Sequence, residues 1–158
     1  PVLPSLAGGE MIAAAERISA ASGCVGSIGI DFVAGEKTWA IEINPRFQAT
    51  LDTVEMAIRK SVFAMHMNAC RGGVIPVTVP VPRQVAVRRI LFAERDMRLE
   101  ADLSDLAPRI ADIPPWPGTE FEEGGHAVVS VYGCGKTEEE AYADFERNTA
   151  AVRKRIGR

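Results

Sequence analysis

Residues 27–33 read Ser-Ile-Gly-Ile-Asp-Phe-Val, residues 38–44 read Thr-Trp-Ala-Ile-Glu-Ile-Asn, and Pro45 and Arg46 follow directly. Large apolar side chains alternate with small or polar ones in both stretches, which is the two-residue period of a β-strand. The residues between them, 34–37, include a glycine and two charged side chains and predict a turn. The two stretches therefore predict a β-hairpin, whose second strand ends at the proline because proline cannot donate to the strand ladder.

Pairing of Val33 with Thr38 would place the large apolar side chains of both strands on one face of this hairpin. In that register Asp31 lies opposite Ala40, and Glu42 is its diagonal neighbour at roughly 7–8 Å. The other face then carries small and polar residues, namely Ser27, Gly29, Asp31, Val33, Thr38, Ala40, Glu42 and Asn44. A small, acidic face backed by an apolar one predicts the floor of a ligand site.

Carboxylate and amide oxygens are ligands that suit Mg²⁺, and Asp31, Glu42 and Asn44 supply such oxygens on one face. Arg46 lies just beyond the strand end, where a guanidinium group can bind a phosphate through two hydrogen bonds. These residues predict a site for a magnesium-bound nucleoside phosphate. The plainer alternative stays open at this point, because half-exposed hairpins commonly carry acidic residues on their wet face for solubility.

The stretch Gly-Ile-Asp-Phe-Val, followed by Ile-Glu-Ile-Asn-Pro-Arg-Phe-Gln, resembles the metal-binding end of the ATP-grasp superfamily. The resemblance implies that Asp31, Glu42 and Asn44 bind two magnesium ions, which bridge the phosphates of ATP. It also implies that Arg46 contacts the transferring phosphoryl group or an acyl phosphate. The apolar residue two positions after the first acid lines the adenine pocket in that family, and Val33 matches it.

The resemblance is specific across residues 25–56, and Asn-Pro-Arg-Phe-Gln is similar to an archaeal ATP-grasp group that includes tyramine–glutamate ligase. Such enzymes activate a carboxylate as an acyl phosphate and then let an amine attack it. The implied substrates are therefore a small-molecule carboxylate and an amine. Biotin carboxylases have a glutamate four residues after the arginine, whereas this chain has Thr50, which disfavours bicarbonate as the substrate. Asp52 and Glu55 are the acids that could compensate.

Two other functions stay open beside the ligase. The chain could be a non-catalytic magnesium–ATP-binding or assembly module, or it could belong to an enzyme that forms carboxyphosphate or carbamoyl phosphate. The resemblance also implies a preceding nucleotide-binding domain, lid lysines and a hinge acid, for which the residues before 25 have no counterpart. The chain is therefore expected to be the C-terminal portion of a larger ATP-grasp ligase and to be inactive by itself.

The composition is that of an ordinary globular protein, with 158 residues, 47% of them hydrophobic and 25% charged, and a net charge of −3. This mildly acidic balance argues against nucleic acid as a partner. No apolar run is long enough to predict a transmembrane helix, so a membrane is not an expected partner either. Cys24, Cys70 and Cys134 match no zinc-binding spacing, which favours buried, reduced side chains and a cytoplasmic location.

The remaining periodic stretches predict helices over residues 9–22, 54–70 and 138–156 and strands over residues 84–94 and 126–134. Residues 112–119 predict a turn region under which Trp116 packs. His66 lies in the middle of its predicted helix and is expected to be a packed side chain rather than a catalytic one.

The expected fold is therefore α+β and has two parts. Residues 1–75 would form the metal-binding half of an ATP-grasp domain, an antiparallel sheet with helices. Residues 76–83 are rich in proline and valine and predict a linker. Residues 84–158 would form a small, strand-rich C-terminal subdomain.

Residues 133–137, Gly-Cys-Gly-Lys-Thr, are superficially similar to a phosphate-binding loop, but Ser130 stands where that motif needs a glycine. Thr137 instead predicts a helix cap, and Glu140 completes a capping box. The order of strand, glycine turn and helix resembles the C-terminal subdomain of carboxylase-like ATP-grasp members. That resemblance implies scaffolding, lining of the cleft and dimer contacts, so a homodimer is expected.

Overall fold

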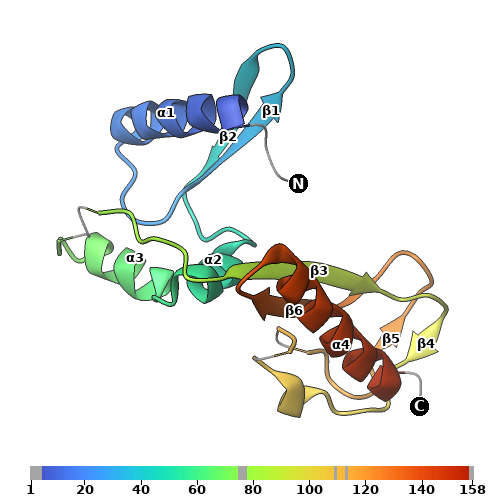
Figure 1. Cartoon of the computed structure of the whole chain (residues 1–158). Helices are drawn as coiled ribbons and strands as arrows, with labels where there is room; N and C mark the ends of the chain where they lie inside the picture. Colours follow the sequence, from blue (N-terminus) through green and yellow to red (C-terminus); the bar gives the residue numbers. More distant parts are fainter. Residues whose placement is uncertain (1–4, 75–77, 109, 113, 157–158) are drawn as a thin grey trace. The chain divides into compact units, whose positions relative to one another are not determined.

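The computed structural model describes residues 5–74, 78–108, 110–112 and 114–156, and it has the expected α+β fold (Figure 1). Its helices are α1 (Ser5–Ser22), α2 (Leu51–Ile58), α3 (Val62–Cys70) and α4 (Glu138–Ile156), with a 3₁₀ helix at Ser104–Leu106. Its strands are β1 (Gly29–Ala34), β2 (Thr38–Asn44), β3 (Val85–Phe92), β4 (Met97–Arg98), β5 (Glu120–Phe121) and β6 (Ala127–Gly135). These strands pair as β1–β2, β3–β6 and β4–β5.

The chain divides into two compact units. The first unit contains residues 1–52 and 60–79, and the second contains residues 53–59 and 80–158. The predicted linker, residues 76–83, begins outside the described residues, and its described part is irregular. Among the described residues, no helix combines the length and the apolar character needed to cross a membrane.

In the first unit, α1 lies against the β1–β2 hairpin. A hydrogen bond of 3.2 Å from Thr38 Oγ1 to Glu10 Oε2 joins the second strand to the helix. The helix ends at Ser22, as the sequence predicts, and Gly23 follows with φ of 68°. Glycine reaches this left-handed conformation without the steric penalty of a side chain, so the chain can turn back toward the hairpin.

A β-bulge in the hairpin makes the predicted register wrong. Phe32 pairs with Ala40, but the next pair is Asp31 with Glu42, which leaves Ile41 as the extra residue. Asp31 therefore does not face Ala40, and Glu42 is its direct partner rather than a diagonal neighbour. An alternating sequence does not reveal such a bulge, because the pattern of each strand remains regular by itself.

The helix predicted over residues 54–70 is two helices. The first, α2, begins earlier, at Leu51, and ends at Ile58, after which Arg59 has φ of 53°. The second, α3, begins at Val62, and Ser61 caps it by accepting a 3.1 Å hydrogen bond from the Ala64 amide. The capping serine was a local signal for this break, but the continuous apolar stripe concealed it.

The core of the second unit lies between α4 and the β3–β6 pair (Figure 1). The predicted apolar stripe of α4 is correct: Ala141, Phe145, Thr149 and Val152 are buried, and they share one face of the helix. Val131 of β6 is fully buried beneath them. The segment after β4 completes this core with Leu99 and Leu103, which are also fully buried.

Close contact between α4 and β6 requires glycine in the strand. A Cβ atom on Gly133 would overlap the Ala141 carbonyl and the Phe145 amide, and a Cβ atom on Gly135 would overlap the Ala141 amide and the Glu140 side chain. The obstructing atoms are mainly helix backbone, which has no alternative rotamer. The helix can therefore approach this end of the strand only because both positions lack side chains.

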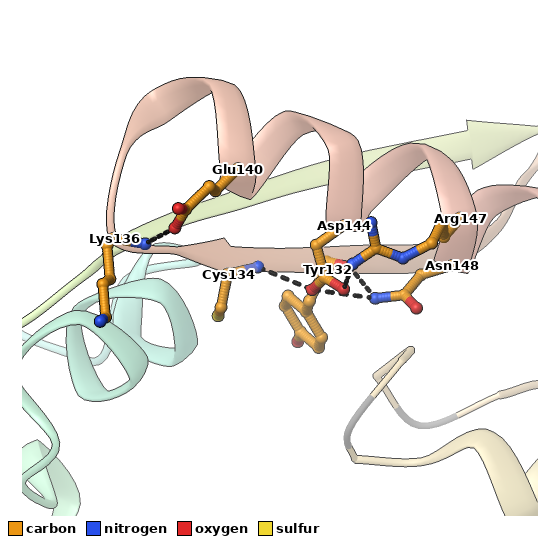
Figure 2. A network of polar contacts seen from close by, with 7 residues as sticks. All are labelled: Tyr132, Cys134, Lys136, Glu140, Asp144, Arg147 and Asn148. Carbon is orange, nitrogen blue, oxygen red and sulfur yellow. Dashed lines mark hydrogen bonds and ion pairs between the residues drawn. The ribbon is translucent and has the colours of Figure 1, made fainter.

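A polar network joins α4 to the edge of β6 that faces away from β3 (Figure 2). The segment around Ala111 pairs with part of this edge, at Val131. Asp144 Oδ2 accepts the Cys134 amide at 2.9 Å, and Asn148 Nδ2 donates to the Tyr132 carbonyl at 2.8 Å. Arg147 binds the other oxygen of Asp144 at 2.8 Å. Beyond that bridge, helix side chains thus satisfy backbone groups of the edge that another strand could pair, which protects this part of the sheet.

The turn into α4 is a helix cap, as predicted. Thr137 Oγ1 accepts the Glu140 amide at 3.2 Å, and the Glu140 carboxylate accepts the Lys136 amide at 2.7 Å (Figure 2). The reciprocal bond of the capping box therefore reaches Lys136 rather than Thr137. A carboxylate bound to the turn backbone repels a phosphate, in agreement with the rejection of a phosphate-binding loop here.

Two predictions about burial are wrong. Trp116 does not pack under its turn but is 85% exposed. Pro117 and Gly118 form a tight turn after it, in which the Thr119 amide binds the Trp116 carbonyl at 3.2 Å. Cys24 and Cys70 are exposed rather than buried. Cys134 is partly buried, and burial together with the negative charge of Asp144 raises the pKa of its thiol.

Replacement of Gly133 by alanine should destabilise the second unit by about 1–3 kcal/mol, because the added methyl group must displace helix backbone. Urea unfolding followed by circular dichroism measures this change. Gly125→Ala is the matched control, since a Cβ atom there meets nothing closer than 3.9 Å. Equal stability of the two variants would show that α4 does not depend on this close approach.

Replacement of Asp144 by alanine should lower the free energy of unfolding by about 1–2 kcal/mol, because the Cys134 amide loses its acceptor. Glu146→Ala changes an exposed acid on the same helix and should have little effect. Hydrogen exchange of the Cys134 amide gives a second readout, and it should become faster only in Asp144→Ala. Unchanged exchange would contradict the role assigned to this network.

Candidate metal and phosphate site

The centre of the candidate site is a pair of carboxylates that face each other across the hairpin. Asp31 of β1 and Glu42 of β2 are direct partners in the register. Asn44 bridges them, because its Nδ2 donates to Asp31 Oδ2 at 3.3 Å and to Glu42 Oε1 at 2.9 Å. Like charges directly opposite each other destabilise a sheet, so this amide compensates for part of their repulsion.

Arg46 completes the cluster from the loop after β2. Its amide binds the Asn44 carbonyl at 2.8 Å across Pro45, which gives a tight three-residue turn. The turn brings the guanidinium group back, so that Nη2 donates to Asn44 Oδ1 at 3.2 Å and Nη1 donates to the Phe47 carbonyl at 3.2 Å. Asn44 therefore presents its NH₂ group to the two acids and its oxygen to the arginine.

This environment lowers the pKa of Glu42 below its ordinary value. The hydrogen bond from Asn44 is the largest cause, followed by the hydrogen bond with Asp31 and then by the positive charge of Arg46. Each of these interactions favours the ionised form of the carboxyl group. Glu42 is therefore a carboxylate at neutral pH, as a metal ligand must be.

The chemistry of these donors fits magnesium better than a softer metal. Among the described residues, no three histidine, cysteine, aspartate or glutamate side chains converge in a way that could hold a metal ion. The cluster offers two carboxylates and one amide oxygen, and Mg²⁺ typically takes one or two carboxylates and completes its shell with water and phosphate oxygens. The side-chain NH₂ group of Asn44 lies between Asp31 and Glu42. Its partial positive charge occupies the position where these carboxylates would bind a cation.

The bulge brings Trp39 to the acidic face, which the predicted register did not. Val33 pairs with Trp39 rather than with Thr38, and it alternates with Asp31 along the same strand. Both apolar side chains are largely open to solvent, with exposed fractions of 56% for Val33 and 62% for Trp39. An exposed apolar pair thus lies on the hairpin face that carries the carboxylates.

Gln48 supports the site and was not singled out from the sequence. Its Nε2 donates to the Arg46 carbonyl at 3.0 Å and to the Asn44 carbonyl at 3.4 Å. A Cβ atom on Gly29 would overlap the Gln48 side chain, so this glycine gives the glutamine its room. The motif contains the glutamine, but only the folded loop shows that it holds the backbone on both sides of Pro45.

The loop also rests on α3 through an aromatic contact. The Phe47 ring lies 4.5 Å from the His66 ring and 5.5 Å from the Phe63 ring, between centroids. His66 Nδ1 accepts the Ser27 amide at 2.9 Å, and its Nε2 lies 3.6 Å from Cys70 Sγ. His66 is thus a packed and hydrogen-bonded side chain, as predicted, and it steadies the loop that carries Arg46.

Comparison with known protein families gives a match within the first unit. Residues 4–50 match the family model described as an ATP-grasp domain. No curated protein sequence matches the chain.

Two solved structures are similar over almost the whole chain. N5-carboxyaminoimidazole ribonucleotide synthetase from Thermus thermophilus is 19% identical with a TM-score of 0.62, and the match covers 100% of this chain and 41% of that chain. The same enzyme from Thermotoga maritima is 19% identical with a TM-score of 0.61, and the match covers 98% of this chain and 43% of that chain. This chain therefore spans about two fifths of the length of these structures. It has the fold of part of these structures, and the residues that match the ATP-grasp model include Asp31, Glu42, Asn44 and Arg46.

Proposed function

We propose that the chain is the metal-binding part of an ATP-dependent ligase, which joins a carboxylate to an amine through an acyl phosphate. The observation that carries this proposal is the cluster on the hairpin. Two opposed carboxylates, Asp31 and Glu42, share the Asn44 amide, and that amide is bound in turn by Arg46. A solubilising acidic face does not require a bridging amide or an arginine returned by a tight turn.

In this proposal Asp31, Glu42 and Asn44 hold two magnesium ions together with the phosphates of ATP. Bound magnesium would supply positive charge to the phosphate oxygens, which is the main requirement of phosphoryl transfer. Arg46 stabilises the negative charge of the transferring phosphoryl group and of the acyl phosphate. The tight turn and the hydrogen bonds from Gln48 keep its guanidinium group close to the carboxylates before ATP arrives.

The apolar part of the same face supports a nucleotide as the ligand. Val33 would line the adenine pocket, and Trp39, its cross-strand partner, would extend that apolar surface. A nucleobase needs an apolar contact and its phosphates need charge, and the hairpin offers both on one face.

Formation of carboxyphosphate is the second candidate function. Both solved structures described above are named for the synthesis of a carboxyamino product, which favours bicarbonate as the acid. Thr50 opposes this assignment, because it occupies the position of the glutamate in the carboxylase motif. The sequence of residues 44–48 instead favours a carboxylate–amine ligase such as the group that includes tyramine–glutamate ligase.

Turnover should depend on the two acids. In the natural protein that carries this chain, Asp31→Asn and Glu42→Gln should each reduce magnesium-dependent release of ADP by about 100-fold or more. Each substitution removes a negative charge that would bind the magnesium ions. Glu36→Gln alters an exposed acid in the turn of the same hairpin and should leave the rate unchanged. Near-normal rates in both site variants would refute the proposal.

The same assay separates the candidate functions. A panel of amino acids and small amines tests the ligase, and release of ADP should require one acid and one amine together. Release that requires only bicarbonate would establish the carboxyphosphate pathway instead. Binding of magnesium–ATP without release of ADP under any condition would instead support a non-catalytic ATP-binding module.

Ionisation of Glu42 should follow the lowered pKa. Its carboxylate should stay ionised to lower pH than that of an ordinary glutamate. The stabilisation from its hydrogen bonds is therefore complete above the ordinary pKa of glutamate, and it is lost as the pH falls through the lowered pKa of Glu42. Carbon-13 NMR titration of the side chain measures this value. Asn44→Ala should shift the pKa upward, since it removes the largest cause, whereas an unchanged titration would show that the bridge has no electrostatic effect.

A further inference from the structure

A second concave site lies in the second unit and shares no residue with the hairpin. It is a cavity of about 550 Å³ between the end of β3, the Val128 position of β6 and the last turns of α4. Cavities of about 300–1,000 Å³ are the usual size of small-molecule sites. None of the functions considered above uses this cavity.

Part of the cavity wall is apolar and open to solvent, beside the charged residues that also line it. Ile90 and Phe92 of β3 line it and are 44% and 52% exposed, while Ile156 lines it from α4. Large aliphatic and aromatic side chains on a strand normally gain stability by burial, so this exposure leaves apolar surface for a ligand to cover.

A β-bulge lies beside the cavity. Leu91 pairs with Val129 and Phe92 pairs with Ala127, so Val128 has no direct partner in β3; it is buried and lines the cavity. Ala93 also lines it and is held by a hydrogen bond of 3.1 Å from its amide to the His126 carbonyl. Strand β3 therefore forms one side of the cavity, and the bend that follows it supplies Glu94 and Arg95.

The charged residues that line the cavity favour an anion. Arg95 and Arg153 line the cavity together with Glu94, and Glu94 Oε1 lies 2.7 Å from Arg153 Nη2. Two guanidinium groups and one carboxylate leave one net positive charge. A ligand with an apolar body and a single negative charge complements this combination, and a carboxylate is the group that guanidinium binds with two parallel hydrogen bonds.

We propose that this cavity binds an amphipathic monocarboxylate, with its hydrocarbon part against Ile90, Phe92 and Val128 and its carboxylate at Arg95 and Arg153. The site is separate in its residues from the carboxylate cluster of the hairpin. Binding here does not require ATP, magnesium or the proposed ligase activity.

Decanoate is the probe, titrated below its micelle concentration into the complete 158-residue chain and followed by methyl NMR. The methyl groups of Leu91, Val128 and Ile156 should shift together and saturate. Decanol and decyltrimethylammonium have the same hydrocarbon part with a neutral or a positive head group. Each should bind about tenfold or more weakly than decanoate, since it lacks the charge-assisted hydrogen bonds.

Two variants and one matched control test the head-group contact. Arg95→Gln and Arg153→Gln should each raise the Kd for decanoate about tenfold and leave the Kd for decanol unchanged. Lys154→Gln removes the same charge from the same turn of α4 at a residue that does not line the cavity, and it should change neither value. Thermal unfolding of each variant verifies that it is folded, and Arg95→Gln keeps the ion pair between Glu94 and Arg153.

Three results would overturn the proposal. The first is saturation that shifts methyl groups elsewhere and not those of the cavity. The second is equal affinity for decanoate in the wild-type chain and both arginine variants. The third is a dimer in sedimentation analysis that dissociates in Phe92→Ser and blocks decanoate, because a second copy of the chain would then be the occupant.

Discussion

Two carboxylates that face each other across a two-stranded hairpin repel, and the arrangement of the candidate site follows from that repulsion. Asp31 and Glu42 are direct partners because the bulge at Ile41 shifts the register. The Asn44 amide donates to both of them, and Arg46 binds the oxygen of that amide. The acids, the amide and the arginine thus form one charge-compensated group. A ligand that brings positive charge to the acids and negative charge to the arginine would be bound by interactions of the same kind.

The loop that presents Arg46 is held from several sides. Gln48 binds the carbonyl groups on either side of Pro45, and Phe47 packs on His66, which is itself bound to the Ser27 amide. An arginine side chain has many rotamers when it is free. Because the loop backbone and the contact with Asn44 already restrict Arg46, less entropy is lost when an anion binds. This is the physical reason to regard the loop as a preformed part of a site.

The second unit solves a different problem, which is how one helix covers a narrow sheet. Gly133 and Gly135 let α4 approach the strand, and Asp144 and Asn148 then reach the edge of β6 and satisfy its backbone groups (Figure 2). At the other end of the same sheet, a second bulge leaves the Val128 position unpaired and the cavity lies there. Tight packing at one end and a bulge at the other separate the structural part of this unit from the part that is open to a ligand.

Much of this protein can be predicted from the sequence, because its signals are local. The strand period of residues 27–33 and 38–44, the stripe on α4 and the Thr137 cap each depend on neighbouring residues. The structure agrees with them, although the first strand runs from Gly29 to Ala34. The two-residue strands β4 and β5 were missed, since such short strands have no period. The continuous stripe of residues 54–70 likewise concealed the break at Arg59.

The sequence by itself determined which residue types could form a site: two acids, an amide and an arginine around one hairpin. Only the tertiary structure decided that Asp31 faces Glu42, that Trp39 joins their face and that Gln48 supports the loop. The physical reason is that a bulge changes the pairing between strands without changing the pattern along either strand. The cavity beside Phe92 likewise depends on contacts between segments far apart in the chain, so no local pattern predicts it.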